Sequence, residues 1–317
     1  MTKKRFWQIA LKFAALIVIL ALTFTGLSFL FVPRNNNVAF GVDSLTANGI
    51  LGEPKNTIDL LVLGDSEAYA SFSPMEIWKT YGVTSYVCAT ANQLLVDSRH
   101  FLEQAFENQT PKIVLLEVNA CFRQIKLSDI VEARIETVFP LFYYHDRWKT
   151  LKLSDFKKGA EYSWKDDYKG FRFNKSIDPI MNEEYMIKTD EVEELSAMNE
   201  ESLEKIIEFC NNHGAKLILY SAPSIKNWSY EKHNGIQLFT NRHNLDYVDT
   251  NIVPEVKIDW LSETRDRGDH VNYFGAVKVT DYVGKFIMSK YKLPDHRNDP
   301  QYDVWNNSQI VYDNSAR

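Results

Sequence analysis

The chain has 317 residues, of which 45% are hydrophobic and 25% charged, and its formal net charge is −6. This composition is globular, and the length allows one catalytic domain with a full hydrophobic core. The acidic balance excludes the polybasic surface by which proteins bind nucleic acid, so no nucleic-acid partner is expected. Cys88, Cys121 and Cys210 are too few and too scattered for a disulfide framework or a zinc site.

The N-terminal segment predicts a membrane anchor. A basic cluster at residues 3–5 precedes Phe13–Val32, a run of 20 residues without a charge. At about 1.5 Å per residue, a helix of this length spans the hydrocarbon core of a bilayer. Because the basic residues come first, the N-terminus is expected in the cytoplasm and the rest of the chain outside the cell membrane. A cleaved signal peptide is the alternative, but its apolar region is normally shorter.

Residues 1–34 are therefore expected to form a cytoplasmic stub and a transmembrane helix. The next stretch, 35–56, is rich in Asn, Gly and Pro and predicts a linker. The main domain is expected to occupy residues 57–295, and a polar, loosely held tail to occupy 296–317.

The main domain begins with a short apolar run from Ile58 to Leu63, which predicts a buried parallel strand. Gly64 permits a tight turn, and Asp65 and Ser66 follow it at the carboxyl end of that strand. Open α/β sheets bind their ligands at this end. Taken alone, Gly-Asp-Ser is more often an ordinary turn whose serine caps a helix, so Ser66 needs support from elsewhere in the chain.

Strands and helices alternate along the rest of the domain. Further strands are expected at 83–88, 113–118, 216–220 and 245–248, and the longer helices at 94–106, 191–213, 230–241 and 273–291. This alternation predicts an α/β protein with a three-layer, flavodoxin-like fold on a roughly five-stranded parallel sheet, in addition to the N-terminal transmembrane helix.

Residues 120–198 are less regular and dense in aromatic residues with cationic side chains between them. They predict an insertion over the mouth of the sheet, because aromatic rings with a few polar groups suit sugar stacking and apolar contacts. His145 and Arg147 are candidate substrate-binding residues. A local pairing of His, Asp and Arg on a surface helix is an equally good interpretation.

A second polar stretch, at 265–272, supplies the partners that a nucleophilic serine needs, namely a base and an orienting acid. His270 is the candidate base. Adjacent side chains on extended backbone point to opposite sides, whereas Gly268 can turn the chain so that Asp266 meets the imidazole. Asp266 is therefore the predicted acid, and Asp269 is the alternative, with a helix cap near residue 273 as its other predicted role.

These stretches together resemble the SGNH/GDSL hydrolases, specifically the membrane-anchored bacterial type found beside systems for cell-surface polysaccharide O-acylation. The resemblance is carried by Gly-Asp-Ser at 64–66, the strand at 113–119, the strand and loop at 216–224, and the histidine stretch at 266–276. It implies an exported serine esterase or O-acyltransferase, with acetyl as the expected group, that acts on a cell-surface glycan through an acyl-enzyme.

The resemblance also implies an oxyanion hole formed by the backbone N–H groups of Ser66 and Ala89 and the side chain of Asn119. Two departures from the family pattern bear on it. Ala89 stands where relatives have glycine, and the fuller Gly-x-Asn-Asp pattern around Asn119 is absent, so a simple turn cap is an equal alternative for Asn119. The family also tends to place its acid three residues before the histidine, where this chain has Arg267.

The resemblance implies an acylated cell-surface glycan as substrate, with a membrane-bound O-acyltransferase as a candidate partner. No metal or other cofactor is expected, because the sequence contains no His-Glu-x-x-His motif and no paired His or Cys spacing. A catalytically weak, membrane-tethered module that binds glycan or the acyltransferase is the alternative function. The departures at 89 and 119 favour the module, and the presence of Ser66 and His270 favours the enzyme.

Overall fold

The computed structural model describes residues 3–32, 45–156, 166–181 and 184–317. The chain divides into two compact units. Unit 1 comprises Met1–Leu45 and Leu127–Ser163, and unit 2 comprises Thr46–Lys126 and Trp164–Arg317. The insertion expected at 120–198 is therefore split, because most of its first half groups with the N-terminal helix and its second half with the sheet.

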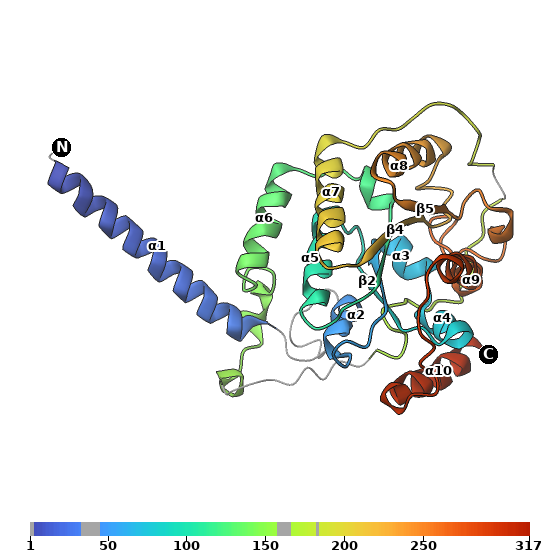
Figure 1. Ribbon diagram of the computed structural model, residues 1–317, viewed down its shortest axis with the longest axis horizontal. Helices are drawn as coiled ribbons and strands as arrows, with labels where there is room; N and C mark the ends of the chain where they lie inside the picture. Colours follow the sequence, from blue (N-terminus) through green and yellow to red (C-terminus); the bar gives the residue numbers. More distant parts are fainter. Residues whose placement is uncertain (1–2, 33–44, 157–165, 182–183) are drawn as a thin grey trace. The chain divides into compact units, whose positions relative to one another are not determined.

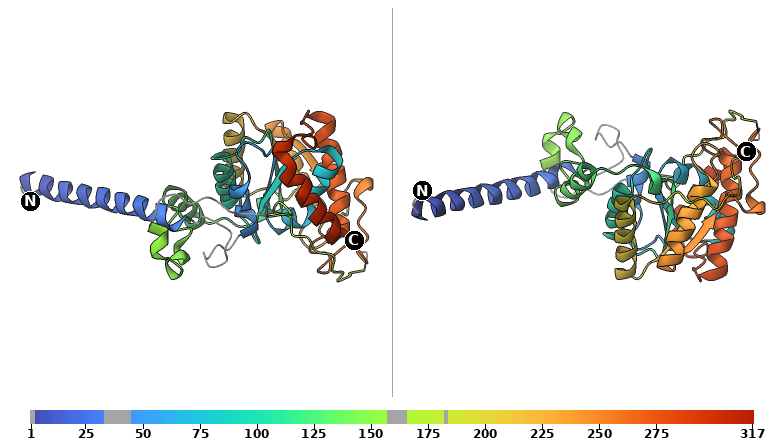
Figure 2. Two further views of the ribbon diagram at one scale, coloured as in Figure 1. Left: turned by 90° about the horizontal axis from the view of Figure 1, so that it is seen from below. Right: turned by 90° about the horizontal axis from the view of Figure 1, so that it is seen from above.

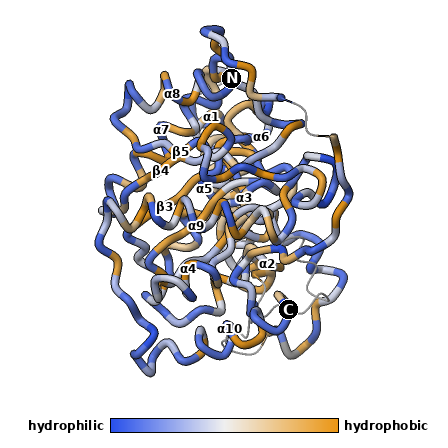
Figure 3. Tube along the Cα trace, turned by 90° about the vertical axis from the view of Figure 1, so that its right-hand side faces the viewer, coloured by the Kyte–Doolittle hydropathy of each residue, from blue (hydrophilic) through white to orange (hydrophobic). Residues whose placement is uncertain are grey.

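Unit 2 is built on a parallel sheet with the strand order β2-β1-β3-β4-β5. The strands are β1 (Leu60–Gly64), β2 (Ser85–Ala89), β3 (Ile113–Glu117), β4 (Lys216–Ser221) and β5 (Asp246–Asp249). β1, β2 and β3 are buried along their whole length, as nearly continuous apolar runs require when both faces of a sheet are covered. Figure 3 shows apolar segments around β3 and β4 and more polar loops toward the rim. The strand order confirms the predicted flavodoxin-like winding.

Helices cover both faces of this sheet, which makes the three layers that the sequence predicted. On one face α5 (Leu95–Phe106) packs against α7 (Ala197–Asn212). On the other, α9 (Tyr273–Lys290) packs against both α3 (Ser66–Ser71) and α4 (Pro74–Tyr81) (Figure 1). The remaining elements of the core are α8 (Tyr230–His243) beside β5, η3 (Asn119–Phe122) and η6 (Pro254–Val256).

The expected linker at 35–56 is only partly a linker. Residues 33–44 lie outside the described residues, whereas α2 (Leu45–Asn48) and η2 (Gly49–Gly52) form helical turns in which Ala47 and Ile50 are buried. The Tyr86 hydroxyl donates a hydrogen bond to the Thr46 carbonyl at 2.8 Å. Residues from Thr46 onward therefore complete the core of unit 2.

The C-terminal segment is not the loosely held tail expected at 296–317. After η7 (Pro300–Tyr302), α10 (Asp303–Ala316) packs against α4 and lies along the outside of unit 2 (Figure 2). Trp305 is fully buried beside Trp78, and Ser73 donates to the Tyr312 hydroxyl at 2.8 Å. The prediction failed because most of the segment is polar, and only Trp305, Ser308 and Tyr312 form the buried face of α10.

Unit 1 contains α1 (Lys3–Phe31), α6 (Leu127–Val138), η4 (His145–Lys149) and η5 (Leu153–Phe156). α1 is long and apolar enough to cross a membrane, and most of its hydrophobic side chains are exposed. The C-terminal part of α1 packs against the segment that follows α6. The ring of Phe24 lies 5.6 Å from that of Phe139 and 5.2 Å from that of Phe142, and the Arg147 Nε donates to the Leu30 carbonyl at 3.4 Å.

Candidate active site

Ser66 lies on a turn that only glycine allows. Gly64 ends β1 with φ +146°, and a Cβ atom there would lie 2.7 Å from the Cβ of Glu117. Asp65 then caps α3 by accepting a hydrogen bond from the backbone N–H of Glu67 at 2.9 Å. Ser66 is the first residue of α3 and is half-buried. Its hydroxyl is thereby placed at the carboxyl end of β1, beside the point between β1 and β3 where the winding reverses and such sheets bind ligands.

The three predicted oxyanion donors come from the same end of three adjacent strands. Ala89 is the last residue of β2 and pairs in register with Gly64, while Asn119 follows β3. Both residues are buried. The Asn119 Nδ2 donates to the Asp65 Oδ2 at 3.0 Å, and because an amide carries two hydrogens, this bond leaves the second for a substrate oxygen. Their role as oxyanion donors stays a prediction.

The histidine loop turns back on itself through two residues with positive φ, Arg267 at +58° and Gly268 at +77°. This turn brings Asp266 against His270. The Asp266 Oδ2 lies 2.6 Å from the His270 Nδ1, and its Oδ1 accepts the backbone N–H of His270, also at 2.6 Å. Asp269 lies further away, with its Oδ1 4.0 Å from the same Nδ1. Among the two candidate acids, Asp266 alone therefore has the geometry of an orienting acid.

Asp269 does not cap the final helix, contrary to one expectation. Asn272 is the cap of α9, because its side chain accepts hydrogen bonds from the N–H groups of Phe274 and Gly275. Asp269 instead accepts a hydrogen bond from the Asn227 Nδ2 at 2.6 Å.

The electrostatics of the loop suit a general base. Burial alone would raise the pKa of Asp266, but the hydrogen bonds from His270 outweigh it and hold this pKa below its ordinary value. A charged Asp266 favours the tautomer with hydrogen on Nδ1, which leaves Nε2 as an acceptor. That Nε2 is buried and has no hydrogen-bond partner among the residues that the structure describes. An acceptor in this state is available to take a proton from a nucleophile.

The second half of the split insertion supports this loop through its backbone. The Asp178 N–H donates to the Thr264 carbonyl at 3.1 Å, and the Arg267 N–H donates back to the Asp178 carbonyl at 2.9 Å. The Tyr273 N–H donates to the Asn174 carbonyl at 2.7 Å. Residues 174–178 therefore form one wall of the histidine loop.

Three buried carboxyl groups surround the turn at Ser66, and none of them is among the site residues predicted from the sequence. Asp65, Glu67 and Glu117 are each at most 1% exposed. The Arg123 Nε donates to the Asp65 Oδ2 at 3.0 Å, so that carboxylate has a cationic partner. Burial, and next the charge of Asp65, raise the pKa of both Glu67 and Glu117 well above the ordinary range. The turn thus combines one charge-paired acid with two that favour their neutral form.

Asn227, which lies in the segment after β4, joins the turn at Ser66 to the histidine loop. Its Nδ2 donates to the Glu67 Oε1 at 2.8 Å as well as to Asp269. Glu67, Asp269 and His270 place polar atoms within 4.8 Å of one another, which is a set of atom types that can bind a metal. The Asn227 amide bridges the two carboxylates, so a hydrogen-bonded network already accounts for their approach to each other.

His145 and Arg147, the predicted substrate-binding residues, belong to unit 1, whereas Ser66 and His270 belong to unit 2. Arg147 is fully buried, and its Nη2 lies 3.3 Å from Asp155. His145 is exposed, and its Nδ1 lies 2.9 Å from the Phe142 carbonyl. These contacts are local to unit 1, which agrees with the alternative interpretation of the His-Asp-Arg stretch.

No model of a protein family matches the sequence, and no curated protein matches it significantly. Solved structures with a similar arrangement include a lipase/acylhydrolase from Enterococcus faecalis, with 14% identity, a TM-score of 0.39, and 74% of this chain and 98% of that one covered. A GDSL-like lipase from Bacteroides thetaiotaomicron has 11% identity, a TM-score of 0.38, and coverages of 73% and 88%. For an acetyl xylan esterase from Butyrivibrio proteoclasticus the values are 9%, 0.33, 75% and 65%. Similarity at this level is too low to assign an activity, so the chemistry of the site itself must indicate the function.

Proposed function

We propose that the protein is a serine esterase or O-acyltransferase of the SGNH type, with Ser66 as nucleophile, His270 as base and Asp266 as its acid. The observation that carries the proposal is the 2.6 Å contact between Asp266 and the His270 Nδ1. It leaves Nε2 as a buried acceptor in a loop that Asn227 ties to Glu67, the residue next to Ser66.

In this mechanism the Ser66 Oγ attacks the carbonyl carbon of an ester while the His270 Nε2 takes the hydroxyl proton. Asp266 stabilises the imidazolium that forms. The developing oxyanion is held by the N–H groups of Ser66 and Ala89 and by the Asn119 amide. Collapse of the tetrahedral intermediate breaks the ester C–O bond, and the leaving oxygen takes the proton from Nε2. Water or a sugar hydroxyl then attacks the acyl-enzyme and gives its proton to the His270 Nε2; the bond between the Ser66 Oγ and the acyl carbon breaks, and Oγ takes the proton back. Water completes hydrolysis in this way, and a sugar hydroxyl completes transfer.

The proposed substrate is an O-acetylated cell-surface glycan, and the proposed partner is a membrane-bound O-acyltransferase. Two observations support a position of unit 2 outside the cell membrane, where such a substrate would lie. α1 is long and apolar enough to cross a membrane, and the basic residues at 3–5 precede its apolar run, which favours export of the chain beyond α1. Protease added to spheroplasts should then digest unit 2, and a protected unit 2 with an accessible N-terminus would contradict export.

The catalytic proposal is tested by labelling the full-length protein with a fluorophosphonate, which reacts with activated serines. Wild type should label and Ser66→Ala should not, while both unfold at similar temperatures. Release of acetate from isolated cell-wall glycan, compared with release from an aryl acetate, then tests the substrate class. If the folded wild type does not label, the site lacks an activated serine, and the membrane-tethered binding module becomes the better account.

A further inference from the structure

α6 carries a row of apolar side chains. Among the residues that the structure describes, no part of unit 1 covers this row. Leu127, Val131, Ile135 and Val138 are 66%, 49%, 43% and 54% exposed. Their spacing of four, four and three residues places them on one face of the helix. Within α6, all of which the structure describes, no residue is buried. A continuous exposed row of this kind marks a contact surface rather than an ordinary water-facing helix.

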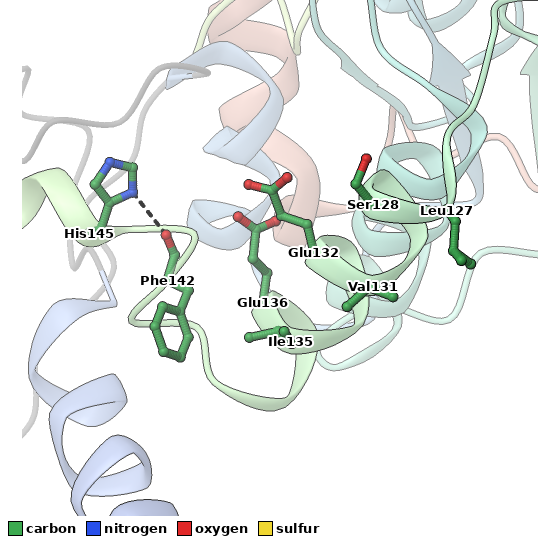
Figure 4. Close-up of a pocket in the computed structure, with 8 residues that line it drawn as sticks. All are labelled: Leu127, Ser128, Val131, Glu132, Ile135, Glu136, Phe142 and His145. Atoms are coloured by element: carbon green, nitrogen blue, oxygen red, sulfur yellow. Dashed lines mark hydrogen bonds between the residues drawn. The ribbon is translucent and has the colours of Figure 1, made fainter.

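Leu127, Val131 and Ile135 of this row form one wall of a largely apolar groove of 730 Å³, and Phe142 forms part of the other (Figure 4). Figure 4 shows the side chains of Glu132 and Glu136 directed away from the side of α6 on which Val131 and Ile135 lie. Glu132 and Glu136 line the groove as well, so an acidic edge borders its apolar wall.

This groove is continuous with the surface of the membrane-spanning candidate α1. The ring of Phe142 packs 5.2 Å from that of Phe24, which lies seven residues before the end of α1 at Phe31. At about 1.5 Å per residue, Phe24 lies roughly 10 Å inside that end. Phe142 is therefore level with the apolar part of α1, and the groove begins at that depth rather than beyond the helix.

The neighbouring short helices extend the same surface. Trp148 in η4 is 64% exposed, while Leu153 and Phe156 in η5 are 88% and 68% exposed. Exposed aromatic residues near the end of a membrane-spanning helix are typical of the layer between hydrocarbon and water.

We propose that α6, η4 and η5 lie in the outer boundary layer of the bilayer that α1 spans, and that the groove takes lipid acyl chains. The proposal rests on the membrane anchor of the proposed function but not on its chemistry. α6 carries Asp129, Glu132 and Glu136 against Arg134 alone, so attraction to anionic headgroups does not drive the contact. Burial of the apolar row drives it, and zwitterionic lipid is therefore sufficient.

The test places an environment-sensitive fluorophore on single cysteines of the full-length protein in phosphatidylcholine vesicles with brominated acyl chains, which quench at short range. The native cysteines are buried and should not label. Ile135→Cys reports on the groove, and Leu22→Cys on α1. Leu238→Cys in unit 2 is the matched control, because Leu238 is 46% exposed and Ile135 43%.

The labels at positions 135 and 22 should lose most of their fluorescence in brominated vesicles, and the label at 238 should be unaffected. Ala133→Cys, at a position of α6 that does not line the groove, should be quenched less than Ile135→Cys, and equal quenching would contradict the proposed orientation. Quenching at 22 without quenching at 135 would refute the lipid contact while leaving the anchor intact, whereas quenching at neither position would refute the anchor. Fluorophosphonate labelling of the same variants reports separately on the catalytic proposal.

A photo-crosslinking residue at position 135 in living cells distinguishes lipid from a protein occupant. Crosslinks to lipid support the proposal. Crosslinks to a membrane protein in place of lipid would overturn it and identify the groove as a protein-binding surface.

Discussion

Replacing Asp266 with asparagine tests the link between structure and proposed chemistry most directly. Asparagine has nearly the same shape, and its oxygen can still accept the backbone N–H that Asp266 accepts from His270 at 2.6 Å. Its amide NH₂ then faces the His270 Nδ1, where a carboxylate oxygen now lies at 2.6 Å. Two donors cannot share one hydrogen bond, so Nδ1 must give up its proton and Nε2 must carry it. In that tautomer Nε2 cannot accept the proton of Ser66.

The expected loss in kcat for Asp266→Asn is about 10²–10⁴-fold, by analogy with acids in other triads. This corresponds to about 3–5 kcal/mol in the activation barrier. The cost in stability is smaller, about 1 kcal/mol or less, because one accepted bond survives and the side chain of Asp266 is 36% exposed. The pKa of Asp266 is held low in the folded state, so its contribution to stability is present above the ordinary carboxyl pKa and lost as the pH falls through the folded value. Wild type and variant should therefore converge in stability in acid.

The assay is turnover of an aryl acetate together with the thermal unfolding midpoint, measured for Asp266→Asn and Asp269→Asn. Asp269 is the matched control because it lies in the same loop, is 34% exposed and has its Oδ1 4.0 Å from the His270 Nδ1. Its replacement should leave kcat near the wild-type value. If Asp269→Asn is inactive yet stable while Asp266→Asn turns over normally, the acid has been assigned to the wrong residue. If both turn over normally, the reasoning from an orienting acid fails.

Three further substitutions, each with its own measurement, test the residues that build the turn at Ser66. Glu67→Gln cannot ionise. The pKa of Glu67 is raised in the folded state, so the contribution of this residue to stability is lost as the pH rises above the ordinary carboxyl pKa. The unfolding midpoint of the variant should therefore gain on that of wild type as the pH rises above that value, and a constant difference would contradict this. Arg123→Met leaves the buried Asp65 without its cation and should cost about 3–5 kcal/mol in urea unfolding, part of which Asp65→Asn should restore. Gly64→Ala should cost about 1–3 kcal/mol in backbone strain and a similar amount in crowding. Gly214→Ala, at φ +70° with no heavy atom within 4 Å of the added Cβ, should show the strain alone.

The sheet was predictable because its strands are short apolar runs with few competing interpretations. β1 and β3 begin and end within two residues of their expected bounds, and their burial on both faces follows from the same residues. That Asp266 would meet His270 was also predictable. Gly268 is the only residue of that loop that can adopt a positive φ without strain, and such a residue lets the chain turn back.

Contacts between distant segments were not predictable in the same way. Asn227 joins Glu67 to Asp269 across 160 and 42 residues, and nothing in the residues around Asn227 indicates either partner. The aromatic residues of 120–198 suggested sugar stacking and apolar contacts, but their composition did not say that Phe139 and Phe142 would meet Phe24. Composition reports how much apolar surface a segment has, and the identity of the surface that covers it depends on the whole fold.

The position of α10 has a consequence for how the protein is made. Ser73 and Tyr312 are 239 residues apart in the sequence, yet they bond to each other in the turn that connects α3 to α4. A ribosome completes the sheet long before it completes this contact, and until then Trp78 lacks the indole of Trp305 against which it packs. Contacts between such distant segments form late. A chain interrupted before α10 therefore lacks part of the cover over Trp78 on α4, next to the helix that carries Ser66, and such chains should be substrates for quality-control proteases.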